Sequence, residues 1–173
     1  MDNRQFIKKM DEYFDMISEA FENPLPIKWV DKGDKLIGLF TVNSNVYQID
    51  CINKGNNVWK YDFFYYVQKL NAMSPAMTEF EKDKFRILPT IKVSMSYLDD
   101  LKSPDAIVFG ATDKSRGRKK IYESFCHDFA NSNDYIFYTQ MQSDRQIFIL
   151  YKKHIDMNVL TDTILKIMQD EKL

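Results

Sequence analysis

The sequence has little of what usually marks a metal or membrane protein. Its 173 residues include two cysteines and two histidines, and these four show no metal-ligand spacing, so we predict no metal site. No stretch approaches the roughly 18 consecutive apolar residues that span a bilayer. Residues 1–16 also lack the apolar core of a signal peptide. We therefore expect a soluble, cytoplasmic protein that does not contact membranes.

The sequence also lacks the short motifs that carry known chemistry. It contains no glycine-rich phosphate loop, no G-x-S-x-G, no H-E-x-x-H and no paired-cysteine motif. His127 and His154 have no nucleophile placed beside them, and both are predicted to be surface residues. Cys51 and Cys126 lie within apolar patterns and are predicted to be buried thiols rather than a disulfide. These absences predict no catalytic residue and no cofactor.

The net charge of the chain gives no overall attraction toward nucleic acid. The chain is also rich in aromatic residues. The net charge is −1, so any nucleic-acid contact would need a local basic patch. Glycine and proline number only five each, against 13 phenylalanines and 10 tyrosines, which predicts a core built largely from rings. The length and the 45% hydrophobic content are typical of one globular domain covering residues 1–173.

The pattern of apolar residues predicts an α/β (α+β) fold. We expect a central, largely antiparallel sheet of about six strands, packed against N-terminal, central and C-terminal helices. The expected parts are an N-terminal helix at 2–22, a β meander at 27–67, a connecting segment at 68–104, a strand–helix–hairpin unit at 105–151 and a C-terminal helix at 156–170.

Turn residues set the predicted strand boundaries, and one segment fits both a helix and a strand. Polar turn residues at 32–34, 43–45 and 54–57 divide the meander into four short strands. Residues 87–101 fit both a helix that begins near Pro89 and an alternating strand, and their length favours the helix. Residues 140–145 are predicted to form the turn of the later hairpin.

An aromatic cluster closes the meander. Such rings could stack single-stranded bases, at about 1–3 kcal/mol per base. Few cations lie near them, and Asp62 lies in their midst, so a core role with a modest surface patch is the favoured interpretation. The cluster consists of Trp59, Tyr61, Phe63, Phe64, Tyr65 and Tyr66.

The stretch from 105 to 137 organises the rest of the chain. An apolar run at 106–111 predicts a buried strand, and polar side chains at 112–115 predict the cap of a helix. Apolar residues then follow at helical spacing, which predicts one buried face. That face consists of Ile121, Tyr122, Phe125, Cys126 and Phe129.

Five cations crowd the predicted start of this helix. A helix N-terminus carries partial positive charge, so cations there are unfavourable by about 0.3–1 kcal/mol each unless an anion is bound. Free backbone N–H groups and a glycine that permits close approach predict an anion-binding or partner-binding site; the alternative is a solvated run of charge. The site residues would be Lys114, Arg116, Gly117, Arg118, Lys119 and Lys120.

The order strand, helix, hairpin over the last 85 or so residues resembles the closing part of the GNAT acetyltransferase fold. The helix carries the Lys-x-x-Tyr pattern from Lys119 to Tyr122. It is also similar to a group of uncharacterised proteins of large bacteriophages. The family's Q/R-x-x-G-x-G/A turn, which holds the acyl-CoA pyrophosphate, has no counterpart in this sequence.

Three functions follow as hypotheses. The first is a non-enzymatic accessory protein, of phage origin if the resemblance holds, that binds a host or viral protein partner through the basic helix start. The second, implied by the resemblance, is an acyl-CoA N-acetyltransferase with a degenerate motif, using Tyr122 or Tyr138 as the acid. The third is a single-stranded nucleic-acid binder that uses the aromatic cluster and the basic turn.

Overall fold

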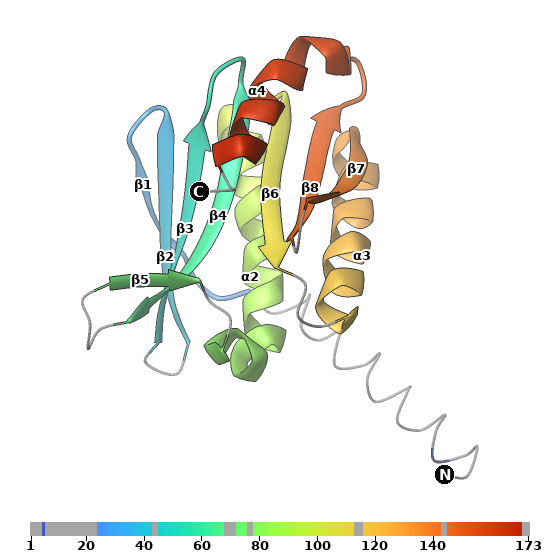
Figure 1. Ribbon diagram of the computed structural model, residues 1–173. Coiled ribbons are helices and arrows are strands. Elements are labelled where there is room, and N and C mark those ends of the chain that lie inside the picture. The colour runs from blue at the N-terminus through green and yellow to red at the C-terminus, as the bar shows by residue number, and fades with distance from the viewer. Residues whose placement is uncertain are drawn as a thin grey trace. The chain divides into compact units, whose positions relative to one another are not determined.

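A computed structural model describes Gln5 and residues 24–42, 45–67, 72–75, 78–112, 116–142 and 145–170 (Figure 1). The predicted helix at 2–22 therefore lies outside the described residues, except for Gln5. The described elements are β1 (Lys28–Asp31), β2 (Lys35–Val42), β3 (Asn45–Asn53), β4 (Val58–Val67), β5 (Ala72–Pro75), α2 (Thr78–Lys102), β6 (Ala106–Thr112), α3 (Arg116–Asn133), β7 (Tyr135–Gln142), β8 (Arg145–Lys152) and α4 (Met157–Asp170).

The strands form one sheet, and the predicted α+β class is confirmed. The sheet has eight strands in the order β1-β2-β3-β4-β6-β8-β7, with β5 pairing to β4, against the six or so expected. The four strands predicted between 27 and 67 are present as β1 to β4. None of the helices in the described ranges is long and apolar enough to cross a membrane.

The chain divides into two compact units, and the single-domain assignment stays a prediction. Strands β1 to β4 and helix α2 each contribute residues to both units. The first unit contains Met1–Trp29, Gly38–Gln48 and Phe63–Tyr97, and the second contains Val30–Ile37, Ile49–Asp62 and Leu98–Leu173.

Stacked rings fill the first unit. The rings of Phe40, Tyr47 and Phe63 pack against one another: the Tyr47 centroid lies 5.4 Å from each phenylalanine, and the two phenylalanine centroids lie 6.1 Å apart. Gly38 is needed beside Trp29, because a Cβ at this position would lie 2.8 Å from the indole ring. The short strand β5, which the sequence pattern did not predict, pairs antiparallel with the end of β4.

Helix α2 corrects the prediction for the connecting segment. The helix begins at Thr78, and the expected start near Pro89 is wrong because this proline lies inside the helix. An internal proline removes one backbone hydrogen bond and costs about 3 kcal/mol. Burial offsets that cost, since Ile87, Ile91 and Met95 recur every four residues and are at most 5% exposed.

The second unit contains the only parallel strand pair among the described pairings. Strands β4 and β6 pair through three positions, from Val58↔Ala106 to Lys60↔Val108. Strand β8 pairs antiparallel with both β6 and β7. The turn predicted at 140–145 is too long, because the ladder between β7 and β8 continues to Gln142↔Arg145.

Alternate residues of β6 and β8 face two different helices. The side chains that face α4 form an aliphatic cluster, and we call this side the α4 face. The predicted apolar residues of α4 are buried in it, apart from Met157, which is half-buried. The cluster consists of Val58, Ala106, Val108, Ile147, Ile149, Leu160, Ile164, Ile167 and Met168.

The intervening residues of the same strands face α3, and we call this side the α3 face. Phe109 of β6 stacks on Phe148 of β8 with ring centroids 4.9 Å apart, and Phe137 of β7 lies 6.1 Å from Phe148. Phe125 and Phe129 of α3 are buried, as their spacing predicted. The two faces of one sheet are therefore covered by chemically different layers.

Tyr135, the first residue of β7, fixes the α3 face to the end of α2. Its single hydroxyl proton is shared between Asp99 Oδ1 at 2.6 Å and the Pro104 carbonyl at 2.9 Å. The ring also lies 5.5 Å from that of Phe129. Burial, followed by the hydrogen bond to Asp99, raises the pKa of Tyr135 well above its usual range.

Candidate functional site

The candidate site lies in the second unit and begins at the parallel pair of β4 and β6. Their pairing ends at Lys60↔Val108, although β6 continues to Thr112. Within the second unit the rings of Tyr61 and Phe109, each one residue beyond that last pair, lie 6.2 Å apart. The sheet continues from this pair to β3 on one side and to β8 on the other.

Helix α3 brings Tyr122 to the carboxyl end of β6. The helix begins four residues after β6 ends, at the same end of the sheet as the arrowhead of β6 (Figure 1). The ring of Tyr122 is set edge-on against Phe109 at 6.3 Å and Phe148 at 5.9 Å. Its hydroxyl group is thus carried by a ring that two buried phenylalanines hold in place.

A buried amide connects α3 to the hairpin β7–β8 beside Tyr122. Gln146 Nε2 donates to Glu123 Oε1 at 3.1 Å and to Thr139 Oγ1 at 2.6 Å. Gln146 is only 2% exposed, and within the described part of the chain its Oε1 has no hydrogen-bond partner. The Thr139 hydroxyl donates onward to the Ile147 carbonyl at 3.1 Å. This network fixes the position of the Glu123 carboxylate.

Glu123, Thr139 and Gln146 were not predicted as site residues. They come from three elements, α3, β7 and β8, which are brought together only by the sheet register. A glutamine within the apolar run of β8 was the one available signal, because a buried amide needs partners. Sequence spacing did not identify those partners.

The two tyrosines considered as acids lie on different faces. Tyr122 packs against Phe148, which places it on the α3 face. Tyr138 is opposite Ile149 in the ladder, so it lies on the α4 face, where it is 49% exposed. One site therefore uses only one of them, and Tyr122 is the tyrosine beside Glu123.

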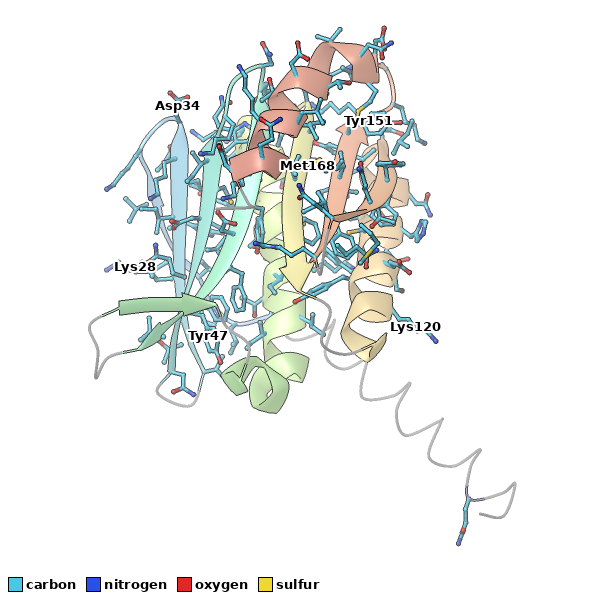
Figure 2. The ribbon with its side chains drawn as sticks, viewed as in Figure 1. Lys28, Asp34, Tyr47, Lys120, Tyr151 and Met168 are labelled. Carbon is cyan, nitrogen blue, oxygen red and sulfur yellow. The ribbon has the colours of Figure 1, made fainter. Side chains whose placement is uncertain are left out.

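The predicted basic site lies at the start of α3, as expected. Arg116 to Lys120 form the first residues of the helix, and Lys120 is exposed and points away from it (Figure 2). Lys114 lies outside the described residues, as do the side chains of Arg116, Arg118 and Lys119. Binding of an anion or a partner through this segment stays a prediction.

The rings proposed for base stacking are partly inaccessible. Trp59 is 2% exposed and Tyr61 is 4% exposed, so neither ring face is available to a base. Trp59 Nε1 donates to Asn57 Oδ1 at 2.9 Å, and Lys102 Nζ lies 5.9 Å from the centroid of the indole ring. The side chains of 64–66 lie outside the described residues. The favoured core role is therefore observed for these two rings.

The cysteines and histidines agree with their predicted placement. Cys51 and Cys126 are buried free thiols, and burial raises the pKa of both, so neither is an activated nucleophile. His127 and His154 are exposed, and the imidazole of His127 is set edge-on against Phe137 at 4.8 Å. In the described ranges no three of the His, Cys, Asp and Glu residues are grouped as metal ligands.

Comparison with known proteins gives structural similarity without sequence similarity. No family model matches the chain, and no curated protein sequence matches it. A mutant of the spermidine N-acetyltransferase SpeG from Vibrio cholerae is similar at 9% identity and a TM-score of 0.43; the match covers 70% of this chain and 66%, less than two thirds, of that one. The N-acetyltransferase PseH from Campylobacter jejuni is similar at 10% identity and a TM-score of 0.40, covering 88% of this chain and 93% of that one.

These neighbours bear on two predictions. Both are GNAT-family N-acetyltransferases, the family whose fold the last part of the sequence resembles. These structures are N-acetyltransferases, so the predicted non-enzymatic accessory protein is given up for its acetyltransferase alternative, which is taken up below as a proposal.

Proposed function

We propose that this protein is an acyl-CoA-dependent N-acetyltransferase whose acid–base pair is Tyr122 and Glu123. The observation that carries the proposal is the position of both residues at the carboxyl end of β6, where β6 leaves its parallel partner β4. Transfer to an amine needs one group that removes a proton from nitrogen and another that protonates the leaving sulfur. A carboxylate and a phenol in adjacent helical positions supply these two groups.

The backbone of β6 fits the extended arm of an acyl-CoA. Beyond Val108 the β4 register ends, yet β6 still pairs with β8 through Thr112. Among the described residues no position of β4 pairs with β6 beyond Val108, so the backbone of Phe109 to Thr112 would accept an amide-containing ligand in the manner of an added strand. When bound, acetyl-CoA supplies the acetyl group as a thioester.

The roles of the protein residues follow from their contacts. Glu123 is held by the Gln146 amide and accepts the proton released from the amine nitrogen. Tyr122 is held by Phe109 and Phe148 and donates its hydroxyl proton to the thiolate. Phe109 and Phe148 are buried and exclude water beside the phenol, which strengthens both electrostatic interactions.

The chain differs from the family in how it binds the pyrophosphate. Residues 68–77, between β4 and α2, contain no glycine, and β5 occupies 72–75. A turn of the family's type is therefore replaced. We propose that the basic start of α3, at Arg116 to Lys120, contributes the positive charge for the cofactor phosphates.

Titration calorimetry with acetyl-CoA, followed by release of CoA thiol in the presence of a panel of amines, tests the proposal. Tyr122→Phe and Glu123→Gln should each lower kcat by about 10²–10⁴-fold while acetyl-CoA still binds. Tyr138→Phe is the matched control, because Tyr138 lies on the α4 face, and its activity should equal that of the wild type. Absence of acetyl-CoA binding at millimolar concentration would refute the proposal.

Three earlier predictions concern the setting of this activity. A phage source, a cytoplasmic location and a macromolecular partner, either protein or nucleic acid, stay predictions. Pull-down from a bacterial lysate with wild-type protein and with an Arg116→Ala, Arg118→Ala, Lys119→Ala variant tests the partner. A stoichiometric partner that is captured by the wild type and lost in the variant would show that the basic helix start binds that partner. If the variant still binds acetyl-CoA with wild-type affinity, the partner contact and cofactor binding use different residues.

A further inference from the structure

Strand β7 is the last strand of the sheet on its side, and it is regular over its whole length. It pairs one-to-one with β8 over eight positions, from Tyr135↔Lys152 to Gln142↔Arg145. Such a ladder contains no bulge that would twist the strand away. Among the described residues no strand pairs with the other edge of β7, so that edge presents backbone N–H and C=O groups at regular spacing.

The composition of β7 makes this edge suited to pairing. All eight residues, YIFYTQMQ, are uncharged, and none is proline or glycine. Ile136, Tyr138 and Met141 are 38%, 49% and 52% exposed. Proteins usually block an exposed edge with charge, proline, a bulge or a very short strand. Strand β7 has none of these four features.

The strand at the other end of the sheet order shows the usual protection. Strand β1 has only four residues, and two of them, Lys28 and Asp31, are charged and exposed. Asp31 is also engaged by Lys102 Nζ at 2.9 Å, and Pro26 lies two residues before the strand. The chain therefore protects one edge of its sheet in the usual way and leaves the other suited to accept a strand.

We infer that β7 pairs antiparallel with β7 of a second copy of this chain, forming a two-fold dimer with a continuous sheet. Residues directly opposite each other in an antiparallel pair share a face. A two-fold axis at Tyr138 therefore places the two Tyr138 rings opposite each other and Ile136 opposite Gln140 of the second copy. All three side chains lie on the α4 face, as their partners in β8 show.

The absence of charge on β7 favours a second copy over an unrelated strand as its partner. Two β7 strands bring no like charges opposite each other, because neither contains a charge. A different strand would find no charged side chain on β7 by which to be recognised, and backbone pairing alone is not selective. A second copy therefore provides a strand that is uncharged along its whole length and complementary to this edge.

Analytical ultracentrifugation of the full chain over a range of concentrations tests the dimer. Tyr138→Lys places two lysines opposite each other at the axis and should raise the dimer dissociation constant about tenfold or more. Val159→Lys is the matched control, because Val159 is an equally apolar side chain that is 64% exposed on α4, and its dissociation constant should be unchanged. Far-UV circular dichroism checks that both variants are folded.

A crosslink gives a second measurement that does not depend on weakening the dimer. Tyr138→Cys should form an intermolecular disulfide on mild oxidation, because opposite residues in an antiparallel pair bring their Cβ atoms within about 5 Å. The native Cys51 and Cys126 are buried and do not compete. Val159→Cys should stay monomeric on a non-reducing gel.

Three outcomes would overturn the inference. The first is a wild-type chain that stays monomeric at about 100 μM, well above the Kd of stable homodimers. The second is a dimer that is unaffected by Tyr138→Lys, and the third is equal crosslinking of the two cysteine variants. None of these outcomes depends on acetyl transfer, so the dimer and the proposed activity fail or stand separately.

Discussion

The two faces of the strands β6 and β8 are built from alternate residues of the same stretches of chain, yet they differ in chemistry. The α4 face is aliphatic, with Val108 and Ile149 packed against Ile164 of the helix. The α3 face instead has stacked rings, such as Phe109 on Phe148, and the buried polar network around Gln146. Strand periodicity allows this division, because neighbouring residues point to opposite sides.

This difference separates a purely structural layer from one that also holds chemistry. Aliphatic side chains fill space without directional demands, so the aliphatic cluster on the α4 face contributes stability and no chemistry. Rings and hydrogen bonds are directional, and they fix Tyr122 and Glu123 on the α3 face in defined positions. Substitutions on the two faces should therefore separate stability from activity.

Phe148→Ala should give the largest effect, because it damages both properties. Phe148 is fully buried and its ring contacts those of Phe109, Tyr122 and Phe137. The free energy of unfolding should fall by about 3–5 kcal/mol. Acetyl transfer should also fall, since Tyr122 loses a ring that holds it. Urea unfolding and kcat/KM measured on folded protein check the two parts.

Ile149→Ala, one residue further along the same strand, should affect stability alone. The free energy of unfolding should fall by about 2–5 kcal/mol, because Ile149 is 2% exposed in the aliphatic cluster. The kcat/KM of the folded fraction should stay at the wild-type value. Val159→Ala on the exposed side of α4 is the control and should change stability by about 0.5 kcal/mol or less. A large loss of kcat/KM in Ile149→Ala would end the separation of the faces.

Tyr135→Phe tests the buried hydroxyl on the α3 face through pH. Loss of the bonds to Asp99 and Pro104 should cost about 1–3 kcal/mol. The folded state raises the pKa of Tyr135, so the unfolded chain loses this proton first, at pH of about 10. Wild-type stability is therefore unaffected by this group below pH 10 and falls as pH rises above it.

The pH dependence distinguishes this tyrosine from the two buried thiols. Cys51 and Cys126 also have raised pKa values, and both the wild type and Tyr135→Phe contain them. The two proteins should therefore begin to lose stability near pH 9.0, the ordinary pKa of a thiol. The additional loss above pH 10 should be absent in Tyr135→Phe. Denaturant unfolding at several pH values between 7 and 11 gives this comparison, and parallel curves for the two proteins would contradict the assignment.

Gln146→Leu should give the smallest change in stability and a clear change in activity. Leucine removes the two donated hydrogen bonds together with the unpartnered Oε1, so the net cost should be about 0.5–1.5 kcal/mol. The Glu123 carboxylate is no longer positioned, and kcat/KM should fall about 10–100-fold. Gln146→Glu is a poor substitute because it would place two carboxylates together. Full activity in Gln146→Leu would show that the amide positions nothing.

Much of the fold could be predicted from local pattern. The turn residues after β1, β2 and β3 mark where each strand ends, and the buried face of α4 follows from the spacing of Leu160, Ile164 and Ile167. Helix α2 was harder, because Pro89 usually begins a helix and here lies inside one. Strand β5 has four residues and no alternating pattern, so its pairing with β4 could not be inferred.

The candidate site was only half predictable. Tyr122 could be found, because it follows Lys119 at a spacing that resembles a known family. Gln146 and Thr139 could not, since one lies within an apolar strand and the other in the strand before it. The register Thr139↔Phe148 and Ala111↔Gln146 sets both beside α3, and a register shifted by one residue would turn them to the other face.

Local pattern predicted most of the described elements, the burial of Cys51 and Cys126, and the basic start of α3, because backbone preferences and side-chain periodicity act over a few residues. The parallel pairing of β4 and β6, which ends at Lys60↔Val108, and the position of β7 at the end of the described sheet emerged only from the three-dimensional structure. Pairing joins residues that are about fifty positions apart in the chain. Its register is set by the burial of both faces together, which no short stretch of the sequence contains.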